Sequence, residues 1–417
     1  MSYKSNFKNV KGTRDILPLE SVRWQRVENV IRKKMEQYNF QEIRFPAFEY
    51  TDLFRKSTGE STDIVQKEMF TFEDMGGRSL ALKPEGTPSV VRIFLQHGFF
   101  NKGALQKFYY IDRMFRQERP QKGRYREFRQ FGAEVIGSSS AETDVELVKS
   151  VFDIFNELNI KGVKLNINSI GCPKCRKNFL EELKSFLKSR LVSLCDDCRR
   201  RYDENPMRVL DCKKDREKIK DAPVPSDFLC GDCSAHFEDF KNRLNSFSIK
   251  FKIENRLVRG LDYYTKTVFE FVNTNLGSQN EVGGGGRYDE LIKFMGGEDT
   301  PASGYAIGID RLMLLLPEKE ERLGVDVYFV TFDEESDTLG RKILESLRDE
   351  GFSCDKDPMK RSVKAQFREA DRQNAKWVIV IGENERKRGV VQLKNMKKGE
   401  QKEISMKTDE IVKELRC

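Results

Sequence analysis

The stretch that decides the fold runs from residue 115 to residue 134 and reads Phe115-Arg116-Gln117-Glu118-Arg119-Pro120-Gln121-Lys122-Gly123-Arg124-Tyr125-Arg126-Glu127-Phe128-Arg129-Gln130-Phe131-Gly132-Ala133-Glu134. It predicts a strand that ends in Arg-x-Glu, a basic loop with Pro and Gly at its tip, and a returning strand. Such a hairpin can hold guanidinium groups over a polyphosphate, because the planar fork of Arg binds phosphate through two hydrogen bonds. The alternative is a surface hairpin with solvated arginines. It leaves unexplained why Gln130 and Glu134 share a strand face with apolar Phe128.

Basic residues cluster in this hairpin and in one other segment. Residues 113–129 hold 7 basic and 2 acidic side chains, and residues 360–398 hold 12 and 4, in a chain of net charge +8. Both segments are candidate phosphate-facing surfaces, although a charge run by itself is more often a solvated face. With only two histidines, a Ser-His-Asp relay and a multi-histidine metal site are nearly excluded. The chemistry must rest on Arg, carboxylates, backbone or a metal.

The segments around the hairpin predict an antiparallel α+β core. Residues 20–37 have helical apolar spacing, and a strand at 41–45 precedes Pro46. Further strands are expected at 108–111, 129–135, 163–167, 268–272 and 304–307, mostly separated by turn residues. Because strands outnumber crossover helices, a doubly wound parallel sheet is disfavoured.

A smaller α/β domain is expected from about Val325. Strand patterns at 325–332 and 377–381 alternate with helix patterns at 339–348 and 411–415. No apolar run approaches the ~18 residues needed to cross a bilayer, and the first five residues lead into polar sequence without the apolar core of a signal peptide. We therefore expect a cytoplasmic protein without a membrane segment.

Seven of the nine cysteines lie between Cys172 and Cys233. They form the pairs Cys172/Cys175, Cys195/Cys198 and Cys230/Cys233 and the single Cys212. In a reducing compartment, repeated C-x2-C pairs indicate zinc more often than disulfides. Since two pairs complete a tetrahedral site, at least one pair is idle or a second, incomplete site exists. The alternative is a set of inert, buried or redox-active thiols in a small helical insertion.

The hairpin resembles motif 2 of class II aminoacyl-tRNA synthetases, and five further segments narrow the resemblance to the bacterial histidyl-tRNA synthetase family. They are Lys11–Asp15, Pro84–Thr87, Leu257–Tyr264, Gly283–Tyr288 and Gly304–Arg311. The strand before Pro46 resembles motif 1, the dimerisation element, and Gly304–Arg311 resembles motif 3. The resemblance implies a homodimer with an antiparallel class II core at 1–171 and 248–324, a helical, Cys-rich insertion at 172–247 and an anticodon-binding domain at 325–417.

The resemblance implies a pocket for L-histidine. In the family, the residues matching Glu85, Thr87 and Gln130 hold the α-amino group, and those matching Glu134 and Tyr264 pair with the imidazole nitrogens. Tyr263 matches the adjoining wall. A carboxylate and a phenol placed at the two ring nitrogens select imidazole, because an analogue leaves a buried polar group unpaired.

The resemblance also implies ATP binding with Mg²⁺. Arg116 matches the family's arginine that binds the α-phosphate, and Arg311 matches the arginine that binds the γ-phosphate. Arg259 matches an arginine that is distinctive of the family. Glu118 belongs to the same set of ATP-binding residues. These are the expected catalytic residues Arg116, Arg259 and Arg311, and no general base is needed because the attacking carboxylate is already ionised. Arg259 has an alternative as a buried ion pair with Asp262 or Glu254. The run Gly283–Gly286 is either a linker or backbone that passes against the adenylate.

Contacts with tRNA(His) are expected at three places. The acceptor end is expected to contact the loop residues Arg119, Gln121, Arg124 and Arg126. The acceptor stem is expected to contact the insertion, and the anticodon region is expected to contact the basic segment 360–398. Relatives commonly carry segments like Cys195–Cys198 and Leu210–Cys212 without an obvious zinc requirement. The preferred zinc ligands are therefore Cys172, Cys175, Cys230 and Cys233, with Cys195 and Cys198 able to replace either pair.

Two rival functions are disfavoured. The synthetase-like regulatory subunit of ATP phosphoribosyltransferase senses histidine without catalysis; it typically lacks the anticodon domain and has lost some of the arginines. A tRNA-binding module without catalysis would not retain both carboxylates and all three arginines. Neither rival is expected to exchange pyrophosphate with ATP in the presence of histidine.

Overall fold

The computed structural model describes residues 7–277, 280–317 and 323–416. The chain divides into two compact units, one of residues 1–16 and 24–318 and the other of residues 17–23 and 319–417. The N-terminal residues 1–5, for which the sequence predicts no signal peptide, lie outside the described residues. Within the described ranges, no helix is both long and apolar enough to cross a bilayer.

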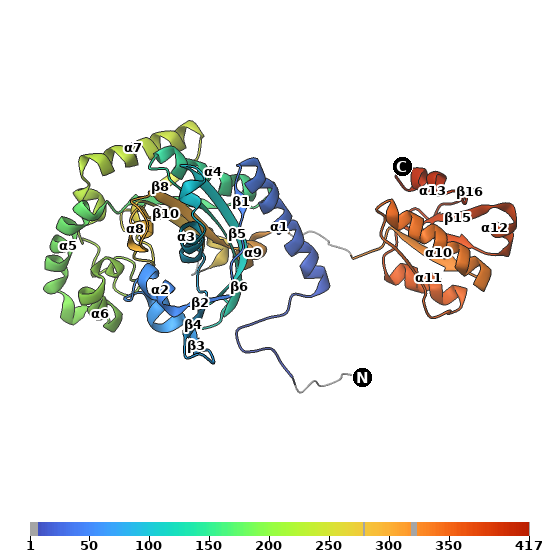
Figure 1. The fold of residues 1–417 in the computed structure, drawn as a ribbon, viewed down its shortest axis with the longest axis horizontal. Helices are drawn as coiled ribbons and strands as arrows, with labels where there is room; N and C mark the ends of the chain where they lie inside the picture. The colour runs from blue at the N-terminus through green and yellow to red at the C-terminus, as the bar shows by residue number, and fades with distance from the viewer. Residues whose placement is uncertain (1–6, 278–279, 318–322, 417) are drawn as a thin grey trace. The chain divides into compact units, whose positions relative to one another are not determined.

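The larger unit is built on an eight-stranded sheet (Figure 1). Its strand order is β1-β5-β6-β11-β10-β9-β7-β8, and all neighbours are antiparallel except the outer pairs β1·β5 and β7·β8. The strands are β1 Gln41–Glu42, β5 Gln106–Phe115, β6 Glu127–Ile136, β7 Lys164–Ser169, β8 Phe251–Ile253, β9 Thr265–Val272, β10 Glu281–Arg287 and β11 Ala302–Gly308. This order confirms the antiparallel core that the sequence predicts.

Helices and a small sheet surround these strands. The α-helices are α1 Pro18–Gln37, α2 Thr51–Thr58, α3 Thr87–Gln96, α4 Ala141–Glu157, α5 Pro173–Lys188, α6 Asp196–Glu204, α7 Gly231–Ser246, α8 Leu291–Phe294 and α9 Ile309–Leu315. Short helical turns, labelled η, include η1 Ile64–Glu68, η2 Phe99–Asn101, η3 Leu191–Ser193, η4 Pro206–Val209, η5 Pro225–Phe228 and η6 Thr274–Leu276. The small antiparallel sheet has the order β2-β4-β3, with β2 Phe48–Tyr50, β4 Ser79–Leu82 and β3 Phe70–Glu73.

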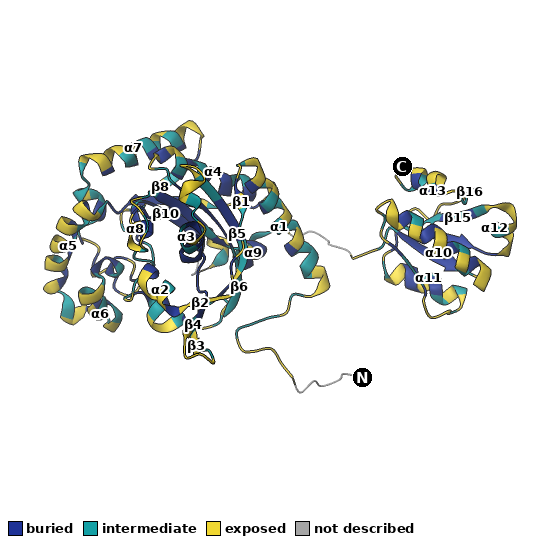
Figure 2. Cartoon of the chain, viewed as in Figure 1, coloured by how far each residue is buried: buried dark blue, intermediate teal, exposed yellow. Residues whose placement is uncertain are grey.

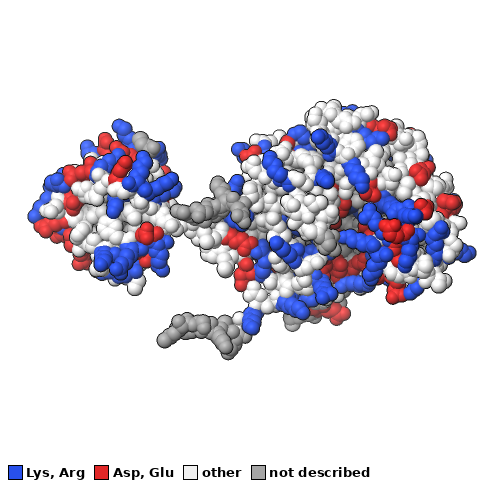
Figure 3. All heavy atoms as spheres, turned by 180° about the vertical axis from the view of Figure 1, so that it is seen from behind, with Lys and Arg blue, Asp and Glu red and all other residues white. Residues whose placement is uncertain are grey.

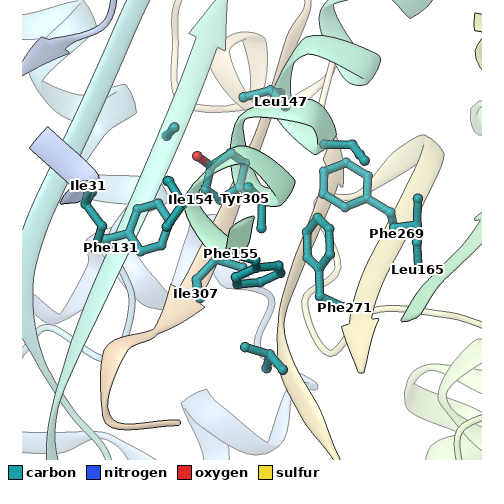
Figure 4. Packing of buried hydrophobic residues seen from close by; sticks show 14 of the residues in the cluster. Ile31, Phe131, Leu147, Ile154, Phe155, Leu165, Phe269, Phe271, Tyr305 and Ile307 are labelled. Atoms are coloured by element: carbon teal, nitrogen blue, oxygen red, sulfur yellow. The ribbon is translucent and has the colours of Figure 1, made fainter. Parts of the chain in front are cut away.

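Alternation along β6 assigns one face of the large sheet to the core and the other to the pocket. Phe131, Ala133 and Val135 point to the first face, where they join a fully buried cluster with helices α1 and α4. Figure 4 shows this packing, with Ile154 and Phe155 of α4 among strand residues such as Phe271. Because successive side chains alternate, Gln130 and Glu134 belong to the opposite face.

The insertion that follows β7 consists of α5, η3, α6, η4, η5 and α7. Its helices keep exposed outer faces, whereas the strands of the large sheet are mostly buried (Figure 2). Apolar side chains of α5 and η4, such as Leu183 and Val209, are buried in one cluster with Tyr263 and Tyr264 of the core. The insertion therefore packs against the loop that carries Arg259.

The smaller unit has a five-stranded sheet in the order β13-β12-β14-β15-β16. Its elements are β12 Val327–Thr331, α10 Glu334–Asp349, β13 Cys354–Lys356, α11 Val363–Arg372, β14 Trp377–Ile381, α12 Glu383–Arg388, β15 Val390–Asn395, β16 Gln401–Ser405 and α13 Thr408–Arg416. Strands β13, β12 and β14 are parallel, and β15 and β16 add antiparallel. Buried side chains lie on both faces of this sheet, so the unit has its own α/β core.

One local expectation differs from the structure, and one of two alternatives is excluded. The predicted strand 41–45 pairs with β5 only at Gln41 and Glu42, and one further bond, from the Ile43 amide to the Tyr109 carbonyl, extends it before Pro46. The glycine run is the central strand β10 rather than a linker. Propensity misses β10 because glycine is a poor strand former, and here pairing with β9 and β11 on both sides outweighs that preference.

Candidate active site

The predicted hairpin is present and places its basic loop over the sheet. Strands β5 and β6 pair from Gln106 opposite Ile136 to Phe115 opposite Glu127, and residues 116–126 connect them. The Arg116 amide donates to the Arg126 carbonyl, and Gln121 bridges Arg124 at the tip. Paired backbone therefore continues into the loop and fixes where its side chains begin.

Three arginines from separate elements line one pocket on this face. Arg116 follows β5, Arg259 lies in the segment before β9, and Arg311 lies in the first turn of α9. The Arg116 Nε donates to the Pro84 carbonyl at 2.9 Å, and Arg311 donates to the Glu281 carbonyl. These backbone contacts orient both guanidinium groups, which leaves their remaining donors for an anion.

Arg259 forms an ion pair different from either alternative that the sequence suggests. Its Nη1 lies 2.9 Å from Glu281 Oε1 and 4.0 Å from Glu270 Oε1. Burial lowers the pKa of Arg259, but the charge of Glu281 more than offsets that effect and keeps the guanidinium ionised. Its Nη1 lies over β10, where a Cβ at Gly284 would come within 2.8 Å of it. Glycine at that position therefore gives Arg259 its place in the pocket.

Glu118 lies between two of the loop arginines. Its carboxylate accepts a hydrogen bond from Arg124 at 3.2 Å and is 3.9 Å from Arg116. Arg124 lines the pocket, Arg126 is half-buried against the carbonyl of Glu118, and Arg119 and Gln121 are exposed. The four predicted acceptor-end residues thus divide between the pocket wall and the outer surface of the loop.

Glu85 is a buried carboxylate whose hydrogen-bond donors in the described structure are both hydroxyl groups. It accepts hydrogen bonds from Thr58 at 2.6 Å and from Tyr263 at 2.8 Å. Burial raises its pKa, and Arg116 acts in the opposite direction. A carboxylate in this setting is stabilised when a bound cation supplies the missing positive charge.

Glu134 does not line the pocket itself but is hydrogen-bonded to a residue that does. Its two carboxylate oxygens accept from Thr87, which lines the pocket, at 2.7 Å and from Tyr288 at 2.6 Å. The residue is fully buried, and a Cβ on Gly304 would lie 1.6 Å from its Oε2, so only glycine fits opposite it. Burial raises the pKa of Glu134 from 4.5 to about 8, with a smaller contribution from Glu85.

This shift predicts a pH-dependent stability that Glu134→Gln removes. Between about pH 4.5 and 8 the folded chain binds more protons at this carboxyl than the unfolded chain, so the free energy of unfolding falls as pH rises through that window. We expect the melting temperature of Glu134→Gln, relative to wild type, to increase from pH 5 to pH 8.5 in calorimetry of the ligand-free protein. Glu127→Gln on the same strand, a half-buried residue paired with Arg113, is the control. A constant difference for Glu134→Gln would contradict the shift.

Sequence reasoning missed three residues that support the two carboxylates and Arg259. Tyr288 donates to Glu134, Thr58 donates to Glu85, and Glu281 holds Arg259. Tyr288 carries a sequence signal, because an aromatic residue directly after a glycine-rich strand can fill space that the glycines leave. Thr58 and Glu281 carry none, since their partners lie far away in the sequence.

Gln130 presents an unused acceptor. It lines the pocket, and its Oε1 is buried and accepts no hydrogen bond in the described part of the chain. Buried polar atoms are rarely left unpaired in native proteins. An amide oxygen in the same pocket as the carboxylate of Glu85 suits a ligand with an N–H donor, such as an ammonium group.

The pocket therefore offers acceptors for a cation and donors for an anion. Glu85, Gln130 and the deeper Glu134 offer acceptors, whereas Arg116, Arg259 and Arg311 offer donors. Such an arrangement can hold an amino acid with its carboxylate directed toward a nucleotide phosphate. Charge that develops during attack on that phosphate would meet donors that are already in place.

Comparison with known proteins identifies the family. The sequence model described as Histidyl-tRNA synthetase matches residues 12–312, and the one described as Anticodon binding domain matches residues 326–417. The histidine–tRNA ligase of Natranaerobius thermophilus is 46% identical over 413 residues, which cover 97% of this chain and 98% of that protein. The chain belongs to the histidyl-tRNA synthetase family.

Solved structures agree with this membership in the histidyl-tRNA synthetase family. The apo structure of S. aureus histidyl-tRNA synthetase matches with a TM-score of 0.84 and 36% identity, over 99% of this chain and 100% of that one. A Bacillus halodurans protein described as an ATP phosphoribosyltransferase regulatory subunit/histidyl-tRNA synthetase matches with a TM-score of 0.66 and 20% identity, over 91% of this chain and 99% of that one. At that identity the second match shows the shared fold alone, so the regulatory alternative gains nothing from it.

The insertion of this family member holds two cysteine clusters. In the first, the ligand atoms of Cys172, Cys175, Cys230 and Cys233 lie within 4.8 Å of one another, and the Sγ atoms of Cys172 and Cys175 are 3.7 Å apart. The pairs sit at the N-terminal ends of α5 and α7. Cys195 and Cys198 do not substitute for either pair, because they cluster with Cys212 and Asp215 instead. The insertion thus brings together the four preferred zinc ligands.

Proposed function

We propose that this chain activates L-histidine with ATP to form histidyl-adenylate and transfers the histidyl group to tRNA(His). The observation that carries the proposal is the pocket that Glu85 and three arginines line together, with the buried Glu134 hydrogen-bonded to its Thr87. Histidine-dependent exchange of pyrophosphate with ATP, followed by charging of tRNA(His), tests it. Exchange that another amino acid drives as well as histidine would refute the substrate.

Histidine recognition is assigned to the carboxylates Glu85 and Glu134 and the residues around them. Glu85, Thr87 and Gln130 are proposed to hold the α-ammonium group, since Glu85 lacks a close cationic partner in the described structure and Gln130 Oε1 lacks a donor. Glu134 and Tyr264 are proposed to face the imidazole, with Tyr263 as the adjoining wall. Rotation of the Thr87 hydroxyl away from Glu134 would open that carboxylate to a ring N–H.

Adenylate formation is assigned to the three arginines of the pocket. Arg116 and Arg259 are proposed to bind the α-phosphate and Arg311 the γ-phosphate of ATP. When the histidine carboxylate attacks the α-phosphorus, negative charge grows on the equatorial oxygens and pyrophosphate leaves. Donors placed in advance by Pro84, Glu281 and the hairpin stabilise that charge more than they stabilise the ground state.

Mg²⁺ is proposed to enter with ATP. Hard oxygen ligands suit this ion, and the carboxylates of Glu118 and Glu281 line the pocket near Arg311. Burial raises the pKa of Glu281, but the charge of Arg259 more than offsets this and leaves it below the usual value, so its carboxylate is available in ionised form. Bound there, the ion would neutralise phosphate charge.

Contacts with tRNA are proposed at the hairpin loop, the insertion and the smaller unit. On the face seen in Figure 3, Lys and Arg side chains form groups on each of the two units, and acidic side chains are interspersed among these groups. Arg119, Gln121, Arg124 and Arg126 are proposed to meet the acceptor end, and the segment 360–398 the anticodon region. The proposed domains are therefore a catalytic core of residues 1–171 and 248–324, an insertion of residues 172–247 and an anticodon-binding domain of residues 325–417, and each of them contacts tRNA.

We further propose a homodimer that acts in the cytoplasm. The strands β2 and β3 carry the exposed aromatic residues Phe48, Tyr50 and Phe72 beside the segment that resembles motif 1. Exposed apolar side chains in such a group are typical of a contact surface. Light scattering that finds only monomers at micromolar concentration would refute the dimer.

A chain that ends before Val325 is expected to retain exchange and lose most tRNA charging. The pocket lies within the larger unit, and the smaller unit has its own core, so removal of the latter leaves the adenylate site intact. Exchange and charging rates measured on the same preparation provide the comparison. Normal charging by the shortened chain would remove the anticodon assignment.

Zinc is proposed to bind Cys172, Cys175, Cys230 and Cys233. The Sγ separation of 3.7 Å and the position of each pair at a helix start suit a closed tetrahedral thiolate site. Bound zinc would tie α5 to α7 across residues 176–229 and so stabilise the insertion, without a part in adenylate chemistry.

Cys175→Ser is expected to lower the metal content by about one zinc per chain. The melting temperature and tRNA charging should fall with it, whereas histidine-dependent exchange stays near the wild-type rate, because this cluster lies outside the pocket. Elemental analysis and calorimetry provide the measurements, with Cys354→Ser as the control for loss of a buried thiol. Unchanged zinc content in Cys175→Ser would exclude this ligand set.

A further inference from the structure

A second cluster in the insertion brings three thiols and one carboxylate together. The ligand atoms of Cys195, Cys198, Cys212 and Asp215 all lie within 4.8 Å of one another. The Sγ atoms of Cys195 and Cys212 are 3.8 Å apart, and Cys212 Sγ is 3.9 Å from Asp215 Oδ2. Cys198 and Asp215 are almost completely buried. None of these residues belongs to the first cluster.

The spacing of these atoms suits a metal ion better than a disulfide. In a disulfide the sulfur atoms are about 2.05 Å apart. Around zinc, with Zn–S of about 2.3 Å, tetrahedral geometry separates two sulfur ligands by about 3.8 Å. The separation of Cys195 and Cys212 equals that edge of a tetrahedron.

The backbone presents the ligands as two short arms. Cys195 caps the N-terminus of α6 and Cys198 follows in its first turn, which repeats the placement of the two pairs in the first cluster. The second arm, Cys212-x2-Asp215, follows η4. Two arms with the same spacing, one from a helix start and one from a turn, are a common way to enclose a structural zinc ion.

The surroundings hold the carboxylate in an orientation that suits a ligand. Asp215 Oδ1 accepts from Lys218 at 2.9 Å, and Oδ2 accepts from the Cys195 amide at 2.8 Å while it faces Cys212. Hydrogen bonds of this kind orient metal ligands, and Lys218 offsets part of the negative charge of three thiolates and a carboxylate. We infer that Cys195, Cys198, Cys212 and Asp215 bind a second zinc ion.

This site fixes the part of the insertion that contacts the Arg259 loop. Between its two arms, Arg208 donates to the Gly260 carbonyl at 2.7 Å and Asn205 donates to Asp262 at 2.5 Å. Gly260 follows Arg259 directly. Loss of the second zinc therefore disturbs the position of Arg259. This consequence for activity, unlike the metal site itself, rests on the proposed function.

Metal counting on the complete chain tests the site. Wild type should contain about two zinc ions per chain, and both Cys172→Ser/Cys230→Ser and Cys198→Ser/Cys212→Ser about one each. Combining all four changes should leave almost none, and Cys354→Ser should keep two. Unchanged zinc content in Cys198→Ser/Cys212→Ser overturns the inference, as does a different metal in this site.

Alkylation of wild type locates the ion without any substitution that risks misfolding. Iodoacetamide followed by peptide mass spectrometry should leave Cys195, Cys198 and Cys212 protected until a chelator removes zinc. Equal modification before and after chelation overturns the site. Cobalt replacement in Cys172→Ser/Cys230→Ser then reports the ligands, because Asp215→Cys should retain the metal and strengthen the sulfur-to-cobalt absorption. An unchanged spectrum excludes Asp215.

The coupling to the pocket has its own readout. In Cys198→Ser/Cys212→Ser the exchange rate should fall by about tenfold or more, since a shift of about 1 Å at a reacting group can cost as much as 10²-fold. Cys175→Ser provides the matched comparison, with one zinc lost and exchange retained. Confirmed loss of the second zinc with normal exchange overturns the coupling but leaves the metal site, and absence of exchange in wild type refutes the proposed function instead.

Discussion

Arg259→Ala is expected to slow histidine-dependent adenylate formation by about 10²-fold or more, with ATP and histidine affinities within about tenfold of wild type. Removal of one donor to a developing oxyanion typically costs that much in rate. The guanidinium lies over β10, held by Glu281, so it meets the α-phosphate without a rearrangement of the pocket. Single-turnover formation of the adenylate, measured beside equilibrium binding, separates the two effects.

Arg256→Ala is the matched control for this variant. Arg256 lies three residues earlier, is half-buried, and donates to carbonyl groups of the insertion rather than lining the pocket of the three arginines. Its loss should leave the adenylate rate nearly unchanged. If Arg259→Ala lowered histidine affinity and rate by equal factors, Arg259 would be a binding residue and the proposed role would be wrong.

Glu134→Ala is expected to weaken histidine binding by about 10²-fold or more and leave ATP binding near wild type. The carboxylate is the deepest acceptor below the pocket, and without it an imidazole N–H would be buried with no partner. The empty protein should still fold, since burial disfavours the ionised carboxylate. Isothermal titration with histidine and with ATP measures both affinities.

Glu127→Ala serves as the comparison at the half-buried end of the same strand. It removes a carboxylate from β6 without touching the pocket, so both affinities should stay at wild type. Intact histidine affinity in Glu134→Ala would refute the assignment of the imidazole site.

Much of the fold follows from the sequence because local signals agree with the tertiary structure. The hairpin is predictable from its basic loop and alternating strands, and β14 at Trp377–Ile381 from its uninterrupted apolar run. The strand β10 is not predictable in this way. Its stability comes from two neighbours that lie elsewhere in the sequence, and its glycines serve contacts such as that with Arg259.

The site shows the same division. Arginines in recognisable motifs could be named in advance, and so could the four cysteines of two C-x2-C pairs. The residues that orient the site's carboxylates and arginines could not be named from the sequence. Thr58 and Glu281 act through distant partners, and the second cluster combines a C-x2-C pair with Cys212 and an aspartate that no spacing rule for thiols includes.

The contact between Gly304 and Glu134 restricts the order in which the two positions can change over evolution. While the carboxylate is present, any side chain at position 304 would collide with it. Loss of Glu134 removes the closest of these contacts, but the backbone oxygen of Ala133, 2.7 Å from such a Cβ, still opposes a larger residue. Any larger residue that the backbone did accept there would then block the return of glutamate. Loss of Glu134 followed by a change at 304 therefore acts as a ratchet. A descendant that has taken both steps cannot regain this carboxylate by a single substitution.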